Sequence, residues 1–134
     1  MSLPKLNNII VVEDSASDRT MMIDFLSNYG ASVQGFFTGD ACIKEIVNQT
    51  IPTPDLILMD YFLDASCASK YDGLDTLAKV KEVSPTTKII MFTSVENERI
   101  IELAKEKGAL GYIVKGTEGF SKLDEMIRSN FSVN

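Results

Sequence analysis

The sequence predicts an α/β fold in which helices cover both faces of a parallel sheet. Strand-like and helix-like segments alternate five times along the 134 residues, the pattern of repeated strand–helix units. Several strand-like segments are apolar at consecutive positions, which is typical of strands buried on both faces. No repeat, linker or low-complexity segment interrupts this pattern. A chain of this length and organisation is expected to form a single domain.

The first strand and helix are predicted from apolar periodicity. Residues 8–13 contain four consecutive aliphatic residues and are predicted to form a buried strand. Residues 17–29 have apolar side chains at helical spacing, and Gly30 follows them at the usual position of a helix C-cap. The apolar face of this helix is expected to comprise Met21, Met22, Phe25, Leu26 and Tyr29.

The second strand–helix unit has a weaker apolar pattern, and a strongly apolar third strand follows it. Residues 32–37 are predicted as a strand, and Thr38 is a candidate N-cap for a helix that runs to about residue 48. Two prolines then stop this helix and lead to the third strand, residues 55–60.

The second half of the chain continues the alternation. A helix is expected between Gly73 and Pro85, and a strand over 88–92. A highly charged helix over 96–107, closed by Gly108, precedes the fifth strand at 110–114. The last helix is expected over 117–130, with four apolar residues facing inward: Phe120, Leu123, Ile127 and Phe131.

Composition excludes several classes of site. The net charge of -6 argues against direct nucleic-acid binding, which needs a basic surface. The absence of histidine removes the commonest zinc ligand and general base. Cys42 and Cys67 have no metal-binding or disulfide pattern and are expected to be reduced thiols. There is no apolar signal core and no run of membrane-spanning length, so we expect a cytoplasmic location without membrane contact.

The domain boundaries are expected close to the ends of the chain. Residues 1–134 are interpreted as one domain with a core over about 7–130, and residues 1–3 as a leader foreign to the natural chain. No further domain is expected after the last helix of this sequence. We therefore expect the chain to be either a single-domain protein or a piece of a larger one.

Polar side chains follow four of the five predicted strands. In a parallel sheet these strand ends lie along one edge, where open α/β folds bind their ligands. Each residue alone has an ordinary explanation as a helix cap or a solvated loop end, but their joint placement indicates a site. These residues are Glu13 and Asp14, Asp60, Thr93 and Ser94, and Lys115.

The chemistry that fits these groups is phosphoryl transfer to a carboxylate. Asp60 would be the nucleophile and phosphoacceptor. Crowded carboxylates favour a divalent cation, and Mg²⁺ prefers oxygen ligands, so Asp14 and Asp60 could bind it directly and Glu13 through water. Lys115 would neutralise phosphoryl charge together with the ion, and Thr93 could donate a hydrogen bond to the arriving group.

With these residues in this strand pattern, the chain resembles the receiver domain of two-component response regulators, including the chemotaxis regulators. The resemblance covers roughly residues 7–130. It implies a flavodoxin-like (βα)5 three-layer sandwich with strand order 2-1-3-4-5. It also implies that a histidine kinase or a histidine phosphotransfer protein phosphorylates Asp60. Such a domain is not an enzyme toward other substrates, because it catalyses only its own phosphorylation and dephosphorylation.

The resemblance assigns further roles. It implies that the backbone carbonyl of Phe62 is a metal ligand, and that Tyr112 is an aromatic switch residue that moves with Thr93. It implies a downstream effector domain or protein as the partner of the switched surface. The sequence leaves open which kinase, signal and effector are involved, and whether the phosphorylated form makes a homodimer.

Two local departures from the family pattern concern loops beside the site. Asp64 stands where many members have proline, and Gly73 comes about five residues later than usual, which indicates an insertion within residues 65–71. This insertion is either a neutral surface feature or a determinant of partner choice. Lys115 is followed by Gly116 rather than by the proline of many members, which leaves the geometry of that bond open.

Three other functions fit these residues less well than phosphorylation does. A pseudo-receiver would keep the fold and work by protein binding alone, although here every catalytic position is filled. A Mg²⁺-dependent nuclease or phosphotransferase of the TOPRIM or haloacid-dehalogenase type usually has an Asp-x-Asp pair, whereas Asp60 and Asp64 are four residues apart. A flavodoxin is disfavoured because Glu13 and Asp14 would face the phosphate of its cofactor.

Overall fold

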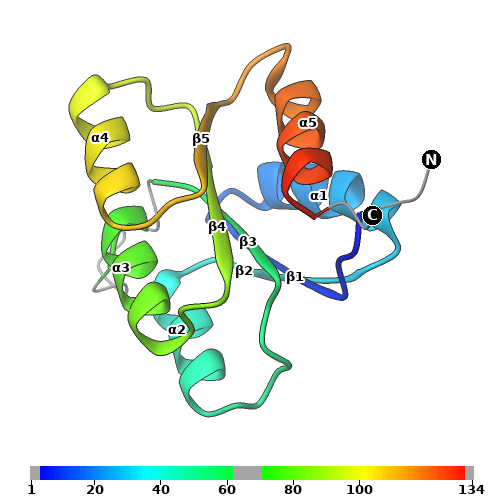
Figure 1. The fold of residues 1–134 in the computed structure, drawn as a ribbon, viewed down its shortest axis with the longest axis vertical. Helices are drawn as coiled ribbons and strands as arrows, with labels where there is room; N and C mark the ends of the chain where they lie inside the picture. Colours follow the sequence, from blue (N-terminus) through cyan, green and yellow to red (C-terminus); the bar gives the residue numbers. More distant parts are fainter. Residues whose placement is uncertain (1–3, 62–70, 132–134) are drawn as a thin grey trace.

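The computed structural model describes residues 4–61 and 71–131, and these residues form one parallel sheet between two helical layers (Figure 1). The five strands are β1 (Asn8–Val12), β2 (Ser32–Phe36), β3 (Leu56–Met59), β4 (Lys88–Thr93) and β5 (Gly111–Val114). The helices are α1 (Ala16–Leu26), the 3-10 turn η1 (Ser27–Tyr29), α2 (Gly39–Val47), α3 (Gly73–Val83), α4 (Glu98–Glu106) and α5 (Gly119–Phe131).

The strand order is β2-β1-β3-β4-β5, as predicted, and every neighbouring pair is parallel. The register matters for the site. Val12 of β1 is paired with Met59 of β3, and Met59 with Met91 of β4. The residues that follow Val12 and Met59 therefore leave the sheet at the same level.

The sheet separates two apolar cores. Helices α1 and α5 cover one face, and α2, α3 and α4 cover the other (Figure 1). Alternate residues of each central strand enter opposite cores, because successive side chains of a strand point to opposite faces. Val11 and Leu58 pack on the α1/α5 side, whereas Val12 and Met59 pack on the other. Both faces of the strands are thus buried, which explains their unbroken apolar runs.

Several local predictions are confirmed. Thr38 is the N-cap of α2, where its hydroxyl oxygen accepts a hydrogen bond from the Ala41 amide. Gly30 and Gly108 both have positive φ, at 75° and 104°, as expected for residues that end helices. Leu123 and Ile127 of α5 are buried, and Phe120 and Phe131 pack against the same core.

The structure corrects details of helices α1, α4 and α5. The α-helical part of α1 ends at Leu26, and the 3-10 turn covers the remainder of the predicted helix. Met21 was expected on the apolar face but is 54% exposed, because its neighbour Met22 takes the inward position. Two helices begin later than predicted, α4 at Glu98 and α5 at Gly119.

Among residues 4–61 and 71–131, no helix is long and apolar enough to cross a membrane. The described part of the chain also contains no cis peptide bond, so the bond between Lys115 and Gly116 is trans. Cys42 is a buried free thiol. Cys67, Asp64 and most of the predicted insertion lie outside the described residues.

Candidate functional site

The predicted acidic residues meet at the carboxyl edge of the sheet because β1 and β3 end in register. The amide of Asp60 donates a hydrogen bond of 3.0 Å to the carbonyl of Val12, which extends the ladder by one residue. The amide of Glu13 likewise bonds the carbonyl of Phe36 on β2, at 2.9 Å. Both acidic residues are therefore held by the sheet itself.

Glu13, Asp14 and Asp60 form a compact group of carboxylates. Each offers one oxygen, and these oxygens lie within 4.8 Å of one another. Glu13 is 1% exposed and Asp60 is 7% exposed, whereas Asp14 is open to solvent. Oxygen donors in an open, partly solvated cluster are the ligands that Mg²⁺ prefers, so the residues fit this ion. Phe62, whose carbonyl was predicted as a further ligand, lies outside the described residues.

Lys115 reaches this group from the end of β5. Its amide bonds the carbonyl of Thr93 at 2.8 Å, which fixes the backbone at the strand end. Its ammonium nitrogen lies 2.5 Å from an oxygen of Glu13 and 3.4 Å from Oδ2 of Asp60. A single cation therefore neutralises part of the charge that the buried carboxylates carry.

The electrostatics of the cluster follow from burial and crowding. Burial raises the pKa of Glu13 to about 7; the hydrogen bond from Lys115 opposes this shift, and nearby Asp60 adds to it. Burial lowers the pKa of Lys115, but its hydrogen bonds to Glu13 and to Asp18 raise it, and the net pKa lies above the ordinary value. The lysine is therefore a permanent cation at neutral pH.

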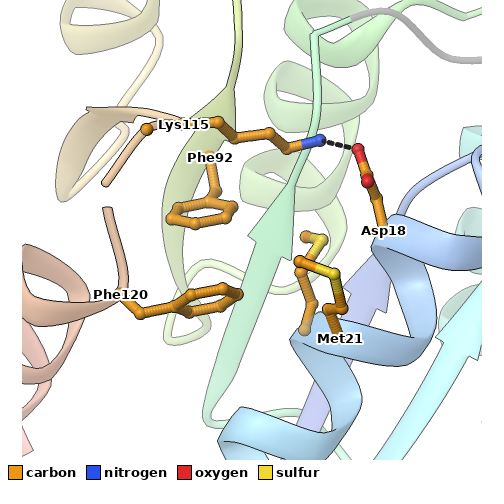
Figure 2. Close-up of a pocket in the computed structure, with 7 residues that line it drawn as sticks. Asp18, Met21, Phe92, Lys115 and Phe120 are labelled. Atoms are coloured by element: carbon orange, nitrogen blue, oxygen red, sulfur yellow. Dashed lines mark hydrogen bonds and ion pairs between the residues drawn. The ribbon is translucent and has the colours of Figure 1, made fainter. Parts of the chain in front are cut away.

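Asp18 is a member of the site that sequence reasoning missed. It lies in the first turn of α1, where its amide donates a hydrogen bond to the hydroxyl of Ser15, the N-cap of that helix. Its Oδ2 lies 2.9 Å from the ammonium of Lys115, as Figure 2 shows. The only signal in the sequence was an acidic residue three positions after a good N-cap, which normally indicates helix stabilisation alone.

Asp18 and Lys115 also border a small, mainly apolar cavity of about 170 Å³ between α1 and α5 (Figure 2). The rest of its lining comes from side chains on α1, β4 and α5 and from the loop before α5: Met21, Met22, Phe92, Gly116 and Phe120.

The carboxylate of Asp60 is oriented by its surroundings. Its Oδ1 accepts a hydrogen bond of 2.7 Å from the amide of Tyr61, and its Oδ2 faces Lys115. Helix α3 begins directly against this segment, because the amide of Gly73 bonds the carbonyl of Tyr61 at 2.8 Å. A Cβ atom on Gly73 would lie only 2.2 Å from the carbonyl oxygen of Asp60. Only glycine fits at the start of α3 without displacing the acidic residue.

Thr93 and Tyr112 lie on neighbouring strands and both bind the same residue. Thr93 is fully buried, and its hydroxyl oxygen accepts a hydrogen bond of 3.3 Å from the amide of Val95. The hydroxyl of Tyr112 donates a hydrogen bond of 2.6 Å to the carbonyl of the same Val95. The two residues predicted as a switch are thus linked through one peptide segment of the β4–α4 loop. Ser94, the other polar residue at this strand end, is exposed.

Comparison with known proteins identifies a family. Residues 9–128 match the response regulator receiver domain. The chain is 26% identical over 120 residues to the transcriptional regulatory protein ZraR of Salmonella typhimurium, covering 90% of this chain and 25% of the relative. It is 25% identical over 107 residues to the chemotaxis protein CheY of Thermotoga maritima, covering 80% of this chain and 83% of the relative.

A solved structure shows the same relationship. The BeF3-activated N-terminal receiver domain of RstA from Klebsiella pneumoniae superimposes with a TM-score of 0.73 at 26% identity. The alignment covers 91% of this chain and 99% of that domain. The chain spans about a quarter of the length of ZraR but most of the length of CheY, so the similarity concerns the receiver domain.

Proposed function

Because the chain belongs to the response regulator receiver domain family, we propose that Asp60 accepts a phosphoryl group in a Mg²⁺-dependent reaction and thereby switches a protein-interaction surface. Receiver domains are signalling domains of two-component systems. The observation that carries the assignment to Asp60 is that this residue belongs to the carboxylate group and also faces the Lys115 ammonium. Asp60 lies at a strand end, with one oxygen bound by a backbone amide and the other facing the cation.

The proposed reaction uses the chain's own groups in defined roles. A carboxylate oxygen of Asp60 attacks the phosphorus atom of a phosphohistidine, a P–O bond forms, and the P–N bond to the departing imidazole breaks. The residues that would hold Mg²⁺ are Glu13, Asp14 and Asp60, together with the carbonyl of Phe62. When bound, the ion supplies charge neutralisation at the phosphoryl oxygens.

Lys115 and Thr93 would stabilise the transferred group. The ammonium of Lys115 lies on the Asp60 Oδ2 side and can contact a phosphoryl oxygen after a short movement. In the unphosphorylated chain the hydroxyl oxygen of Thr93 accepts a hydrogen bond from the amide of Val95. After phosphorylation this hydroxyl would turn and donate a hydrogen bond to the phosphoryl group. The phosphoryl group adds about two negative charges, which gives both residues a reason to move.

The output would follow from the shared contact with Val95. When Thr93 turns away, the amide of Val95 loses its partner, and the loop that also binds the Tyr112 hydroxyl can rearrange. Helix α4 follows this loop directly, β5 contacts α4, and α5 packs against β5; these three elements form the surface proposed to change. Both arrangements exist in equilibrium, and phosphorylation shifts their populations.

The partners follow from the same proposal. The phosphodonor is a histidine kinase or a histidine phosphotransfer protein. The acceptor of the signal is an effector domain or protein, as expected from relatives that are transcriptional regulators. A homodimer formed by the phosphorylated chain through the α4–β5–α5 surface is a further expected assembly.

The test is labelling with a small phosphodonor. Incubation with acetyl phosphate and Mg²⁺ should add one base-labile phosphoryl group to the intact protein, visible by mass spectrometry. Asp60→Asn should remove the label because an amide is not a nucleophile, and a chelator should suppress it in the unmodified chain. Equal labelling of the Asp60→Asn protein would overturn the assignment, and a chain that binds Mg²⁺ but never labels would support a pseudo-receiver.

A further inference from the structure

The ammonium of Lys115 is shared among three carboxylates, and Asp60 is the most distant of them. The contact to Asp18 is 2.9 Å, whereas the contact to Asp60 is 3.4 Å. Figure 2 shows the Lys115 side chain extended toward α1, with its nitrogen joined to Asp18. In the unphosphorylated chain the Lys115 ammonium therefore lies closer to Glu13 and Asp18 than to Asp60, the proposed phosphoacceptor.

We propose that Asp18 is a positioning residue that competes with the phosphoryl group on Asp60 for the ammonium of Lys115, and so lowers the stability of the phosphorylated state. This inference rests on the proposed function, because it concerns the same phosphoryl group. Neither the family pattern nor the sequence prediction assigns a role to Asp18.

The two short contacts of Lys115 differ in how easily they can be released. Glu13 is buried, and its second carboxylate oxygen accepts a hydrogen bond of 3.1 Å from the amide of Ser15. If Lys115 left Glu13, the buried negative charge of Glu13 would have no cationic partner. The Asp18 side chain is 41% exposed, so water can replace the lysine there. When a phosphoryl group on Asp60 attracts Lys115, the contact between Lys115 and Asp18 is therefore the one that breaks.

The sign of the effect follows from this exchange. The unphosphorylated chain keeps the Asp18–Lys115 pair, whereas the phosphorylated chain weakens or loses it. The pair therefore stabilises only the first state, and its removal should favour the second. If Asp18 instead held Lys115 in its working position in both states, its removal would disfavour phosphorylation. The direction of the change separates the two roles.

Three variants isolate the contact. Asp18→Asn removes the charge with little change in shape, and Asp18→Ala removes the contact altogether. Asp18→Glu keeps a carboxylate able to reach Lys115 and should behave like the original chain. Asp24→Asn is the matched control, because Asp24 is exposed on the same helix nearly two turns further along.

The measurement is the apparent affinity for beryllofluoride, a phosphoryl mimic, at fixed Mg²⁺ concentration, followed by amide NMR. Asp18→Asn and Asp18→Ala should each bind about threefold to fivefold more tightly than the original chain, the range expected for a half-exposed ion pair. Asp18→Glu and Asp24→Asn should stay within about twofold. The rate of loss of the phosphoryl group from labelled protein gives an independent readout, and it should fall in the first two variants only.

Each alternative outcome is decisive. Unchanged or weaker binding by both Asp18→Asn and Asp18→Ala would overturn the inference, and so would an equal gain in Asp24→Asn, which would indicate a general charge effect. If the original chain labels on Asp60 and binds beryllofluoride, these results concern Asp18 alone. If the original chain does neither, the proposed function itself fails.

Discussion

The hydroxyl of Tyr112 donates a hydrogen bond of 2.6 Å to the carbonyl of Val95. The amide of that same residue donates to the hydroxyl oxygen of Thr93, at 3.3 Å. One residue in the loop after β4 is therefore held at both of its backbone groups by the two residues of the proposed switch. Movement of Thr93 would remove one of these two bonds, and the position of Tyr112 depends on the other.

Tyr112→Phe tests this link. The substitution keeps the ring and removes the donor to Val95, which should cost the resting arrangement about 1 kcal/mol, equivalent to about a fivefold shift in population. Amide signals of α4 in the unmodified variant should move toward their positions in the beryllofluoride-bound original chain. Signals that stay at the resting positions would show that this hydrogen bond does not hold the switch.

Asp14→Asn tests the metal assignment. Asp14 is the exposed member of the carboxylate group, so its substitution should leave the fold intact while removing one charged ligand. Mg²⁺ affinity measured by calorimetry should fall by about tenfold or more, because hard cations depend on carboxylate charge. Glu102→Gln on α4 is the control for loss of one surface charge, and it should bind like the original chain. Unaltered affinity in Asp14→Asn would remove this residue from the site.

Metal binding should also depend on pH through Glu13. Burial raises the pKa of this carboxyl from its ordinary value of 4.5 to about 7, so near neutrality it still holds a proton in part of the metal-free molecules. A cation favours the ionised form, so the proton must leave as Mg²⁺ binds. Affinity should therefore decline as the pH falls through about 7 and should recover as the pH rises through that value. Glu13→Gln should flatten this part of the profile, and an identical decline in that variant would assign it to another group.

The start of α3 provides a steric test. A Cβ atom on Gly73 would lie 2.2 Å from the Asp60 carbonyl oxygen and 2.6 Å from the Tyr61 Cα atom. Gly73→Ala should therefore lower the free energy of unfolding by about 1 to 3 kcal/mol and weaken phosphorylation, since the backbone of Asp60 must shift. Gly116→Ala is the matched control, because a Cβ atom there meets nothing within 4 Å. Chemical denaturation of the two variants compares them directly, and equal stability would contradict the account.

Much of the fold was predictable because apolar runs and helical spacing both point to the same layers. The aligned ends of β1 and β3 explain why Glu13 and Asp60 could be paired from sequence alone. Helix boundaries were less accurate. Asn97 caps α4 by accepting hydrogen bonds from the amides of Arg99 and Ile100. Asparagine is a preferred N-cap residue, so its position in the sequence could have predicted where α4 begins.

Other features depend on tertiary geometry that periodicity does not encode. Helical spacing placed the adjacent residues Met21 and Met22 on one apolar face, but only Met22 packs in the core between α1 and α5, whereas Met21 is 54% exposed. The contact of Asp18 with Lys115 joins residues 97 positions apart, through a long side chain that crosses from β5 to α1. The sequence shows that both residues are charged, but it does not predict the direction in which the Lys115 side chain extends.

The most direct test of the central claim is to identify the residue that carries the phosphoryl group. The chain would be labelled with acetyl phosphate and Mg²⁺, treated with borohydride to reduce the acyl phosphate, and mapped by peptide mass spectrometry. If Asp60 is the phosphoacceptor, position 60 should be homoserine in the labelled sample and aspartate in a sample without the phosphodonor. Reduction at Asp14 or Asp18 with Asp60 intact would contradict it.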